Sequence, residues 1–286
     1  MSTDASVRVF APAKINLTLH VTGQRSDGYH LLDSMVVLVS TGDWLEMSEA
    51  RETTLSVSGP MARGVPSDAS NLVLRAAELM PVAADIRLEK HLPAAAGIGG
   101  GSSDAAACLR GLAQLSGMPL PDREALLSLG ADVPVCLHPG LTRMSGIGGD
   151  ITPAGPAPAW PILLVNPGIS VPTPAVFKGL ASKNNAPMPD TYPKRASLAD
   201  QAAWMAQQRN DLEAPAIDQA PVIREVLDRL RGMEGCLLAR MSGSGATCFA
   251  IMNTADARDA ALRQLREARP GWWAAAATPL NDPEFS

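Results

Sequence analysis

The chain has 286 residues, enough for one large domain or two modest ones with a proper hydrophobic core. Its formal net charge is −5 and its Lys and Arg residues are dispersed, which disfavours nucleic-acid binding as the main function. Residues 1–10 lack the apolar stretch of a signal peptide, and no later apolar run is long enough to span a bilayer. We therefore expect a cytoplasmic protein with no membrane partner.

The spacing of polar and apolar residues predicts strands and helices through the first half of the chain. Residues 14–22 alternate strictly between polar and apolar, which predicts a half-buried strand. Its period places Lys14 and Asn16 on one open face, about 7 Å apart. A turn and several further elements follow. In chain order they are a turn at 26–28, strands at 35–39 and 54–58, a helix capped by Asn71, a strand at 86–89, a helix through 106–115, and a helix from Asp122 to Leu129 that ends at Gly130.

A proline-rich stretch at 151–160 is the best candidate for a domain boundary, and it divides the chain into 1–155 and 156–286. Beyond it we predict several elements and a second Gly/Ser loop, whereas 182–209 matches no useful pattern. The elements are a buried strand at 162–165, helices at 173–180 and 223–230, and strands around 237–238 and 249–251, which flank the loop at 242–245. The whole pattern predicts two α+β domains.

Neither the cysteines nor the histidines are spaced like metal ligands. No CxxC pair occurs, and three of the cysteines lie in apolar surroundings. We expect free, mostly buried thiols in a reducing compartment. The cysteines are Cys108, Cys136, Cys236 and Cys248.

The most informative segment is a glycine-rich turn between a predicted strand and a predicted helix. Such a turn lets backbone N–H groups approach phosphate oxygens, and the helix N-terminus adds about half a positive charge. A flexible linker is the alternative, but a linker would not be followed at once by a strong Ala/Leu helix. We expect a side chain added at Gly99 or Gly100 to block the site. The residues assigned to it are Pro93, Ala94, Ala95, Ala96, Gly97, Ile98, Gly99, Gly100, Gly101, Ser102 and Ser103.

Three better-known phosphate loops do not fit this segment. A P-loop requires Lys and then Ser/Thr after its last glycine, but Ser102 follows Gly101 directly. A dinucleotide fingerprint requires a glycine five positions after the first, and from Gly97 that position is Ser102. The HRD and DFG motifs of protein kinases do not occur downstream.

The pattern Pro-x-x-x-Gly-Ile-Gly-Gly-Gly-Ser-Ser resembles the ATP-phosphate loop of the GHMP kinases. Further segments, in order, resemble the branch that phosphorylates a diphosphocytidyl methylerythritol, and the resemblance spans about residues 7–252. Ala95 and Ala96 stand where some members have glycine, so we expect a stiffer loop. The segments are 12–17 (PAKINL), 27–32 (DGYHLL), 130–134 (GADVP), 172–177 (PTPAVF) and 241–246 (MSGSGA).

The resemblance implies a two-domain GHMP kinase fold of the α+β class. It implies an N-terminal ribosomal-protein-like β-α domain and a C-terminal α/β sandwich domain. The N-terminal domain would contain a left-handed βαβ unit, although general handedness rules favour the opposite hand. It also implies ATP- and Mg²⁺-dependent phosphorylation of the 2-hydroxyl of the cytidine-linked polyol, a step in the non-mevalonate route to isoprenoid precursors.

The resemblance assigns Asp132 the role of catalytic base and Lys14 a supporting role. Phosphoryl transfer depends mainly on positioning and charge stabilisation, and a base contributes typically ~10²–10⁴ in rate. A neighbouring ammonium stabilises the developing charge. Taken singly, Asp132 fits a helix N-cap and Lys14 a solvated strand residue. The joint motif match favours catalysis.

Three aromatic residues suggest a nucleobase site. Tyr29 and Phe177 can stack on a cytosine, and His30 can read its edge. Alternatively, Phe177 is an ordinary core residue. Asn16, on the strand face of Lys14, and Thr173, within 172–177, are also expected to bind substrate. The second glycine loop either lines the phosphate channel or only connects two strands.

Two rival functions remain open. One is another GHMP kinase, of the homoserine or mevalonate type, and the aromatic residues argue against it. The other is a catalytically silent nucleotide- or RNA-binding protein on the same fold, against which Lys14, Asp132 and the acidic charge balance argue. The sequence does not indicate the magnesium ligands or the oligomeric state.

Overall fold

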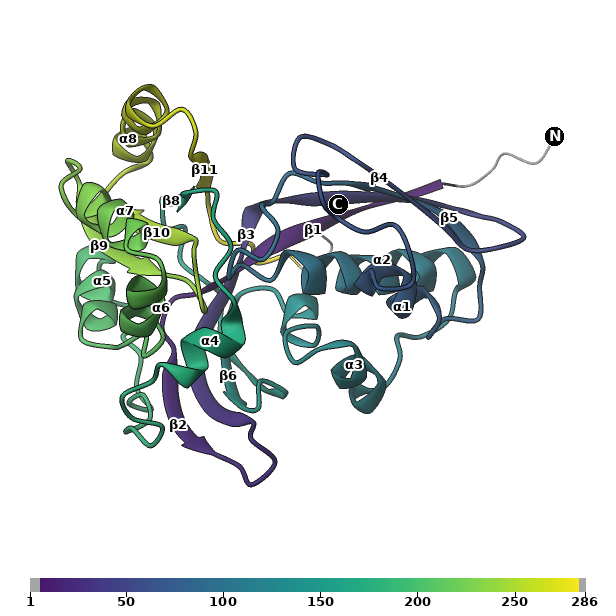
Figure 1. The fold of residues 1–286 in the computed structure, drawn as a ribbon, viewed down its shortest axis with the longest axis horizontal. Coiled ribbons are helices and arrows are strands. Elements are labelled where there is room, and N and C mark those ends of the chain that lie inside the picture. Colours follow the sequence, from purple (N-terminus) through teal and green to yellow (C-terminus); the bar gives the residue numbers. More distant parts are fainter. Residues whose placement is uncertain (1–5, 283–286) are drawn as a thin grey trace.

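The computed structural model describes residues 6–282, which form two β-sheets, each with its own helices (Figure 1). The chain completes the larger sheet before it enters the smaller one. This is the predicted α+β, two-domain arrangement.

The larger sheet has seven strands in the described chain and is built around one very long strand, β3. The order is β4-β5-β3-β6-β7, and β1 and β2 also pair with β3, so β3 connects most of the sheet. The pair β4–β5 is parallel, and the chain crosses between them through a helix. The strands are β1 (Ser6–Asn16), β2 (His20–Gln24), β3 (His30–Glu49), β4 (Thr54–Ser58), β5 (Ala84–Glu89), β6 (Leu141–Gly146) and β7 (Asp150–Gly155).

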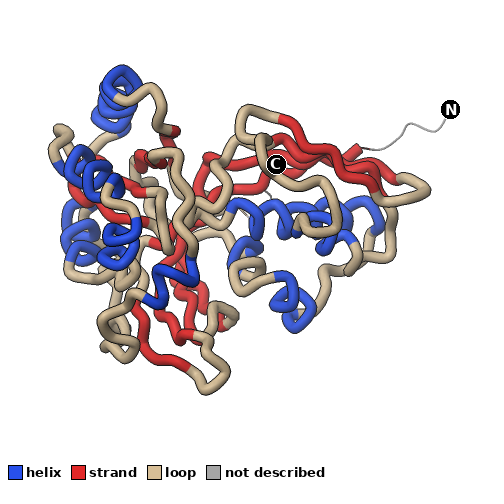
Figure 2. The backbone as a smooth tube through the Cα atoms, in the orientation of Figure 1, coloured by secondary structure: helices blue, strands red, loops and turns tan. Residues whose placement is uncertain are grey.

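Three helices lie on one side of this sheet, as Figure 2 shows. They are α1 (Leu72–Ala77), α2 (Gly100–Ser116) and α3 (Arg123–Leu129). The Asn71 and Asp122 side chains cap α1 and α3 by accepting bonds from backbone N–H groups, which local sequence predicts. In α2, Gly111 faces Met47 of β3, and an added Cβ would require the end of the Met47 side chain to move. This close approach packs α2, which directly follows the glycine loop, against the sheet.

The smaller sheet has four antiparallel strands in the order β11-β8-β10-β9. Its helices pack through regular apolar faces; in α7 the buried residues Ile223, Val226, Leu227 and Leu230 repeat at helical spacing. The strands are β8 (Ile162–Asn166), β9 (Cys236–Met241), β10 (Cys248–Met252) and β11 (Trp273–Ala277). The helices are α4 (Thr173–Lys178), α5 (Leu198–Ala206), α6 (Glu213–Gln219), α7 (Val222–Arg231) and α8 (Ala255–Ala268), and a single 3-10 turn, η1 (Val135–Leu137), belongs to the larger domain.

The two sheets share a hydrophobic core. Ile15 and Val37 of the larger sheet belong to the same buried cluster as Leu164 and Phe249 of the smaller one. The junction is therefore a packed interface, and a site formed there can draw on both sheets.

The predicted single strand at 14–22 is wrong. β1 ends at Asn16 and β2 begins at His20. The predicted open face is also wrong, because Lys14 and Asn16 are only 3% and 1% exposed. The glycine loop, Asp132 and Ser34 contact the residues of this face, which an alternating pattern cannot reveal.

The proline-rich stretch holds a strand that we did not predict. Pro153 lies in β7, at the edge of the larger sheet, where a missing N–H is tolerated. The chain leaves that sheet at Gly155 and enters the smaller one at Ile162. The division at 155/156 stays a prediction.

Candidate active site

A cavity of about 1090 Å³ lies at the junction of the two sheets. Its lining includes β1, the turn between β2 and β3, the glycine loop, the segment after α3, and helix α4. These parts are far apart in the sequence. The site is therefore a product of the tertiary fold.

The glycine loop forms one wall of the cavity. Gly97 and Gly99 have φ values of +71° and +65°, which a residue with a side chain rarely adopts. Gly99 is the N-cap of α2 and provides no side-chain cap, so the first N–H groups of the helix are available to an anion. The predicted residues in the lining are Ala95, Ala96, Gly97, Gly99, Gly100, Gly101 and Ser102, whereas Pro93, Ala94, Ile98 and Ser103 lie outside it.

Lys14 and Asp132 form an ion pair beside this loop. The Lys14 ammonium donates to Asp132 Oδ2 at 2.9 Å, although the residues are 118 positions apart. A Cβ on Gly99 would lie 3.1 Å from Lys14 Cβ, so the lysine passes directly against the loop. Asp132 precedes η1 but does not cap it, because Pro134 occupies the N-cap position. The helix-cap alternative for Asp132 is thus wrong.

Asn16 lies in the lining and fixes the position of Lys14. Its Oδ1 accepts a bond from the Lys14 ammonium at 2.9 Å, and its Nδ2 donates to Ser34 Oγ at 2.7 Å. Both polar ends of the amide are therefore in use within the protein. Any contact of Asn16 with substrate would come in addition to this structural role.

The second glycine loop supports the first from the other sheet. A Cβ on Gly97 would lie 2.5 Å from the carbonyl oxygen of Ser242, and Ser242 Oγ donates to the Gly97 carbonyl at 3.0 Å. Gly243 and Ser244 line the cavity, and the hydroxyls of Ser244 and Thr173 are 2.7 Å apart. The loop therefore lines the cavity and is more than a strand connection.

The aromatic residues lie together at another part of the lining. The rings of His30 and Phe177 stack with centroids 4.6 Å apart, and Tyr29 is 63% exposed. Phe177 also packs against the hydrophobic core, which is the alternative considered for it, and its stacking on a nucleobase stays a prediction. Burial lowers the pKa of His30, and the charge of Lys183 lowers it further. Its imidazole has a buried Nε2 atom without a hydrogen-bond partner among residues 6–282.

Sequence reasoning missed Lys183, which lies in the segment that matched no pattern. Its ammonium donates to Gln24 Oε1 at 3.1 Å, and both side chains line the cavity. The backbone N–H of Asn185 anchors the segment by donating to the Val21 carbonyl at 3.1 Å. No local sequence signal marks such a position, because it depends on where an irregular segment folds back.

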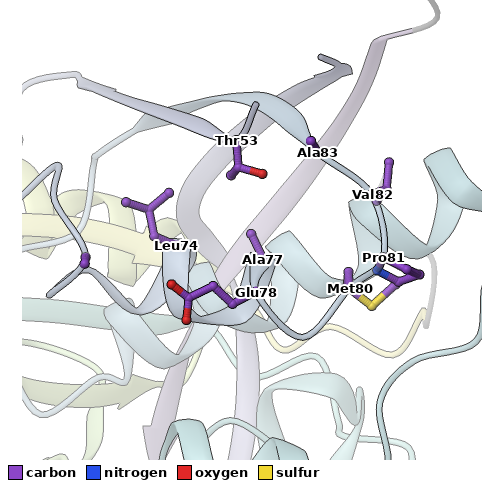
Figure 3. A pocket seen from close by; sticks show the side chains of 9 residues that line it. Thr53, Leu74, Ala77, Glu78, Met80, Pro81, Val82 and Ala83 are labelled. Carbon is purple, nitrogen blue, oxygen red and sulfur yellow. The ribbon is translucent and has the colours of Figure 1, made fainter. Parts of the chain in front are cut away.

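Within residues 6–282, no group of three or more His, Cys, Asp or Glu side chains is placed to hold a metal ion. The same part of the chain has no helix long and apolar enough to cross a membrane. A second cavity, of about 460 Å³, opens beside α1, where Glu78 is its one charged lining residue (Figure 3). Without a cation, that cavity is poorly suited to a phosphate.

Comparisons with known proteins agree with this geometry. The family models described as "GHMP kinases N terminal domain" and "GHMP kinases C terminal" match residues 71–154 and 194–271. The structure of a homoserine kinase from Cytophaga hutchinsonii has a TM-score of 0.67 at 17% identity, covering 98% of this chain and 96% of that one. The fold and the family models place this chain in the class of GHMP kinases, which are small-molecule kinases.

Two closer similarities identify the family within this class. A 4-diphosphocytidyl-2-C-methyl-D-erythritol kinase from Dinoroseobacter shibae is 58% identical over 267 residues, which is 93% of this chain and 92% of the relative. The crystal structure of a 4-(cytidine 5'-diphospho)-2C-methyl-D-erythritol kinase has a TM-score of 0.78 at 34% identity, covering 95% of this chain and 99% of that one. The chain belongs to the 4-diphosphocytidyl-2-C-methyl-D-erythritol kinase family.

Proposed function

We propose that this protein transfers the γ-phosphoryl group of ATP to the 2-hydroxyl of 4-diphosphocytidyl-2-C-methyl-D-erythritol, in the non-mevalonate route to isoprenoid precursors. The observation that carries the proposal is that one cavity contains both a phosphate-type loop with an ion pair and a stacked aromatic pair. The reaction would take place in the cytoplasm, whose reducing conditions suit four free cysteines.

The proposed chemistry assigns one task to each part of the lining. The N–H groups at the start of α2 bind the nucleotide phosphates, where the helix dipole favours negative charge. Asp132 accepts the proton of the attacking hydroxyl as the hydroxyl oxygen bonds to the γ-phosphorus and the bond from that phosphorus to the β,γ-bridging oxygen breaks, which releases ADP. Lys14 remains next to the reacting group and stabilises the charge that develops there. Asn16 accepts a hydrogen bond from the Lys14 ammonium and so keeps Lys14 aligned with the reacting group.

Mg²⁺ fits this site as an ion carried by the nucleotide. Magnesium is usually held by one or two carboxylates together with substrate phosphates and water. The lining offers one carboxylate beside the glycine loop, that of Asp132. When bound, the ion would neutralise phosphate charge during transfer.

An acceptor panel tests the proposal directly. ADP release would be measured with the cytidine-linked polyol, its uridine-linked analogue, free methylerythritol phosphate, homoserine and mevalonate. We expect the cytidine-linked acceptor to have by far the highest kcat/KM, because binding energy from the remote nucleobase positions the reacting hydroxyl. Faster turnover of homoserine or mevalonate would favour the rival kinase, and no ADP release with any acceptor would favour the silent binding protein.

Phe177→Ala should weaken binding of the cytidine-linked acceptor. Stacking of a base on one aromatic side chain contributes roughly 1–3 kcal/mol, which corresponds to an acceptor KM raised about 5- to 150-fold. The KM for ATP should be unchanged. Phe10→Ala is the matched control, because Phe10 also contacts an aromatic ring, that of Trp44, but lies outside the cavity. An acceptor KM equal to that of wild type in the folded Phe177→Ala protein would place the nucleobase elsewhere.

Lys183→Met should raise the acceptor KM about two- to fivefold and weaken its dependence on salt. The acceptor carries a diphosphate, and Lys183 lines the cavity, where its ammonium donates to the uncharged Gln24. The effect should be modest because exposed charge pairs contribute ~0.2–1 kcal/mol. Lys194→Met, an exposed lysine outside the lining, is the control. Equal salt dependence of KM in the two variants would exclude Lys183 from diphosphate binding.

A further inference from the structure

A buried charged cluster lies behind the glycine loop, on the side away from the cavity. It consists of Lys90, Asp43 and Asp104, whose side chains are only 4%, 0% and 4% exposed. Asp43 belongs to β3, Lys90 directly follows β5, and Asp104 lies in the second turn of α2. None of the three lines the cavity, so the proposed reaction gives them no direct role.

The Lys90 ammonium connects the three elements. It donates to Asp104 Oδ2 at 2.6 Å and also to Asp43 Oδ2. The other oxygen of Asp43 accepts from the backbone N–H groups of His91 and Leu92, at 2.5 and 2.8 Å. One carboxylate thus holds both the lysine side chain and the backbone that leads into the glycine loop.

The charges of this cluster are unusual for a purely structural feature. Burial lowers the pKa of Lys90, but Asp104 and Asp43 outweigh that effect and raise it. Burial raises the pKa of Asp104, against the opposing effect of Lys90. Apolar side chains of similar volume are often as stable as a buried ionic cluster, or more so. Stability alone is therefore a weak explanation for these residues.

The cluster contacts the chain at both ends of the glycine loop. Lys90 and its bonded neighbours precede residues 93–99, and Asp104 follows them on α2. A Cβ on Gly100, the first residue of α2, would lie 3.7 Å from Lys90 Nζ, so the ammonium sits directly behind the first turn. The bond between Lys90 and Asp104 sets the distance between the end of β5, where the loop begins, and α2, whose first N–H groups face the cavity.

We infer that Lys90 is a positioning residue for the phosphate site, and that its ammonium joins β3 to α2 and so holds the glycine loop in its anion-binding geometry. The inference rests on the proposed function only in taking ATP as the ligand of this loop. Lys90 itself lies outside the lining of the cavity. Its loss should therefore change nucleotide affinity and not acceptor binding.

The test compares two variants that each remove the cation of an ion pair with a buried carboxylate. Lys90→Met should weaken binding of a non-hydrolysable ATP analogue, measured by calorimetry without acceptor, at least tenfold. It should raise the KM for ATP similarly and leave the acceptor KM within about twofold of wild type. Arg143→Met is the control, because Arg143 pairs with the buried Asp33 of β3, away from the glycine loop. It should lose thermal stability while keeping ATP affinity.

Two results would overturn the inference: wild-type affinity for the analogue in folded Lys90→Met, or an equal loss of affinity in Arg143→Met. If Lys90→Met does not fold, the double variant Lys90→Met/Asp104→Leu removes one of the two carboxylates that lose their cation, while Asp43 keeps its bonds from the backbone N–H groups of His91 and Leu92. The same affinity criterion applies to this variant. Wild-type protein that binds the analogue but phosphorylates no cytidine-linked acceptor would contradict the proposed function and leave the role of Lys90 intact. Wild-type protein that does not bind the analogue would overturn both.

Discussion

Asp132→Asn is expected to lower kcat by ~10²–10⁴ while ATP affinity stays within a few-fold of wild type. The substitution keeps the shape of the side chain and removes its capacity to accept the proton of the attacking hydroxyl. It also converts the ion pair with Lys14, at 2.9 Å, into a weaker contact. A base acts in the chemical step, so the loss should appear in kcat and not in nucleotide binding.

Single-turnover kinetics and analogue binding, measured on the same preparations, would check this expectation. Asp150→Asn is a suitable control, because Asp150 forms an ion pair with Arg123 on the surface and lies outside the cavity. The control should retain wild-type kcat. If folded Asp132→Asn retains most of its turnover as well, Asp132 is not the base, and proton transfer must use another acceptor.

Gly97→Ala is expected to abolish measurable ATP binding. The residue has a φ of +71°, and an added Cβ would lie 2.5 Å from the Ser242 carbonyl oxygen and 2.7 Å from the Gly245 backbone nitrogen. These are backbone atoms of the opposite sheet, so they cannot rotate out of the way as a side chain could. The two glycine loops must separate, which displaces the N–H groups offered to phosphate.

The matched control is Gly117→Ala at the other end of α2. Gly117 has a φ of +68°, but an added Cβ would meet no atom within 4 Å. This control carries similar backbone strain without a steric conflict, so it should lose some thermal stability and retain ATP affinity. Calorimetry on both proteins separates the two effects. Wild-type affinity in Gly97→Ala would show that the loop is only a connector.

At Gly100 the protein itself leaves room for a side chain, and the expectation that one would block phosphate stays a prediction. Gly100 is the first residue of α2, and an added Cβ would have its nearest neighbours at 3.7 Å, an ordinary contact distance. Space within the protein therefore exists at Gly100, unlike at Gly97. A run of consecutive glycines looks uniform in sequence, but only some positions require the absence of a side chain.

Local features of this protein were predictable because they depend on neighbouring residues. Asn71 and Asp122 begin α1 and α3 as N-caps, and the helix after the glycine loop forms as α2. The apolar period of α7 is equally local. The motifs also pointed to both members of the Lys14–Asp132 pair, through resemblance to the GHMP kinases.

Only the tertiary structure decided which residues are buried and which meet. An alternating strand exposes one face unless another part of the chain covers it, and here the glycine loop, Asp132 and Ser34 lie against the buried Lys14 and Asn16. Lys90 carries no sign in the sequence that it binds two buried carboxylates, one of them 47 residues earlier in the chain. Lys183 reaches the cavity only because an irregular segment folds back against β2. Sequence patterns report how one segment alternates, whereas burial and long-range pairing depend on free energies that exist only after distant segments have packed together.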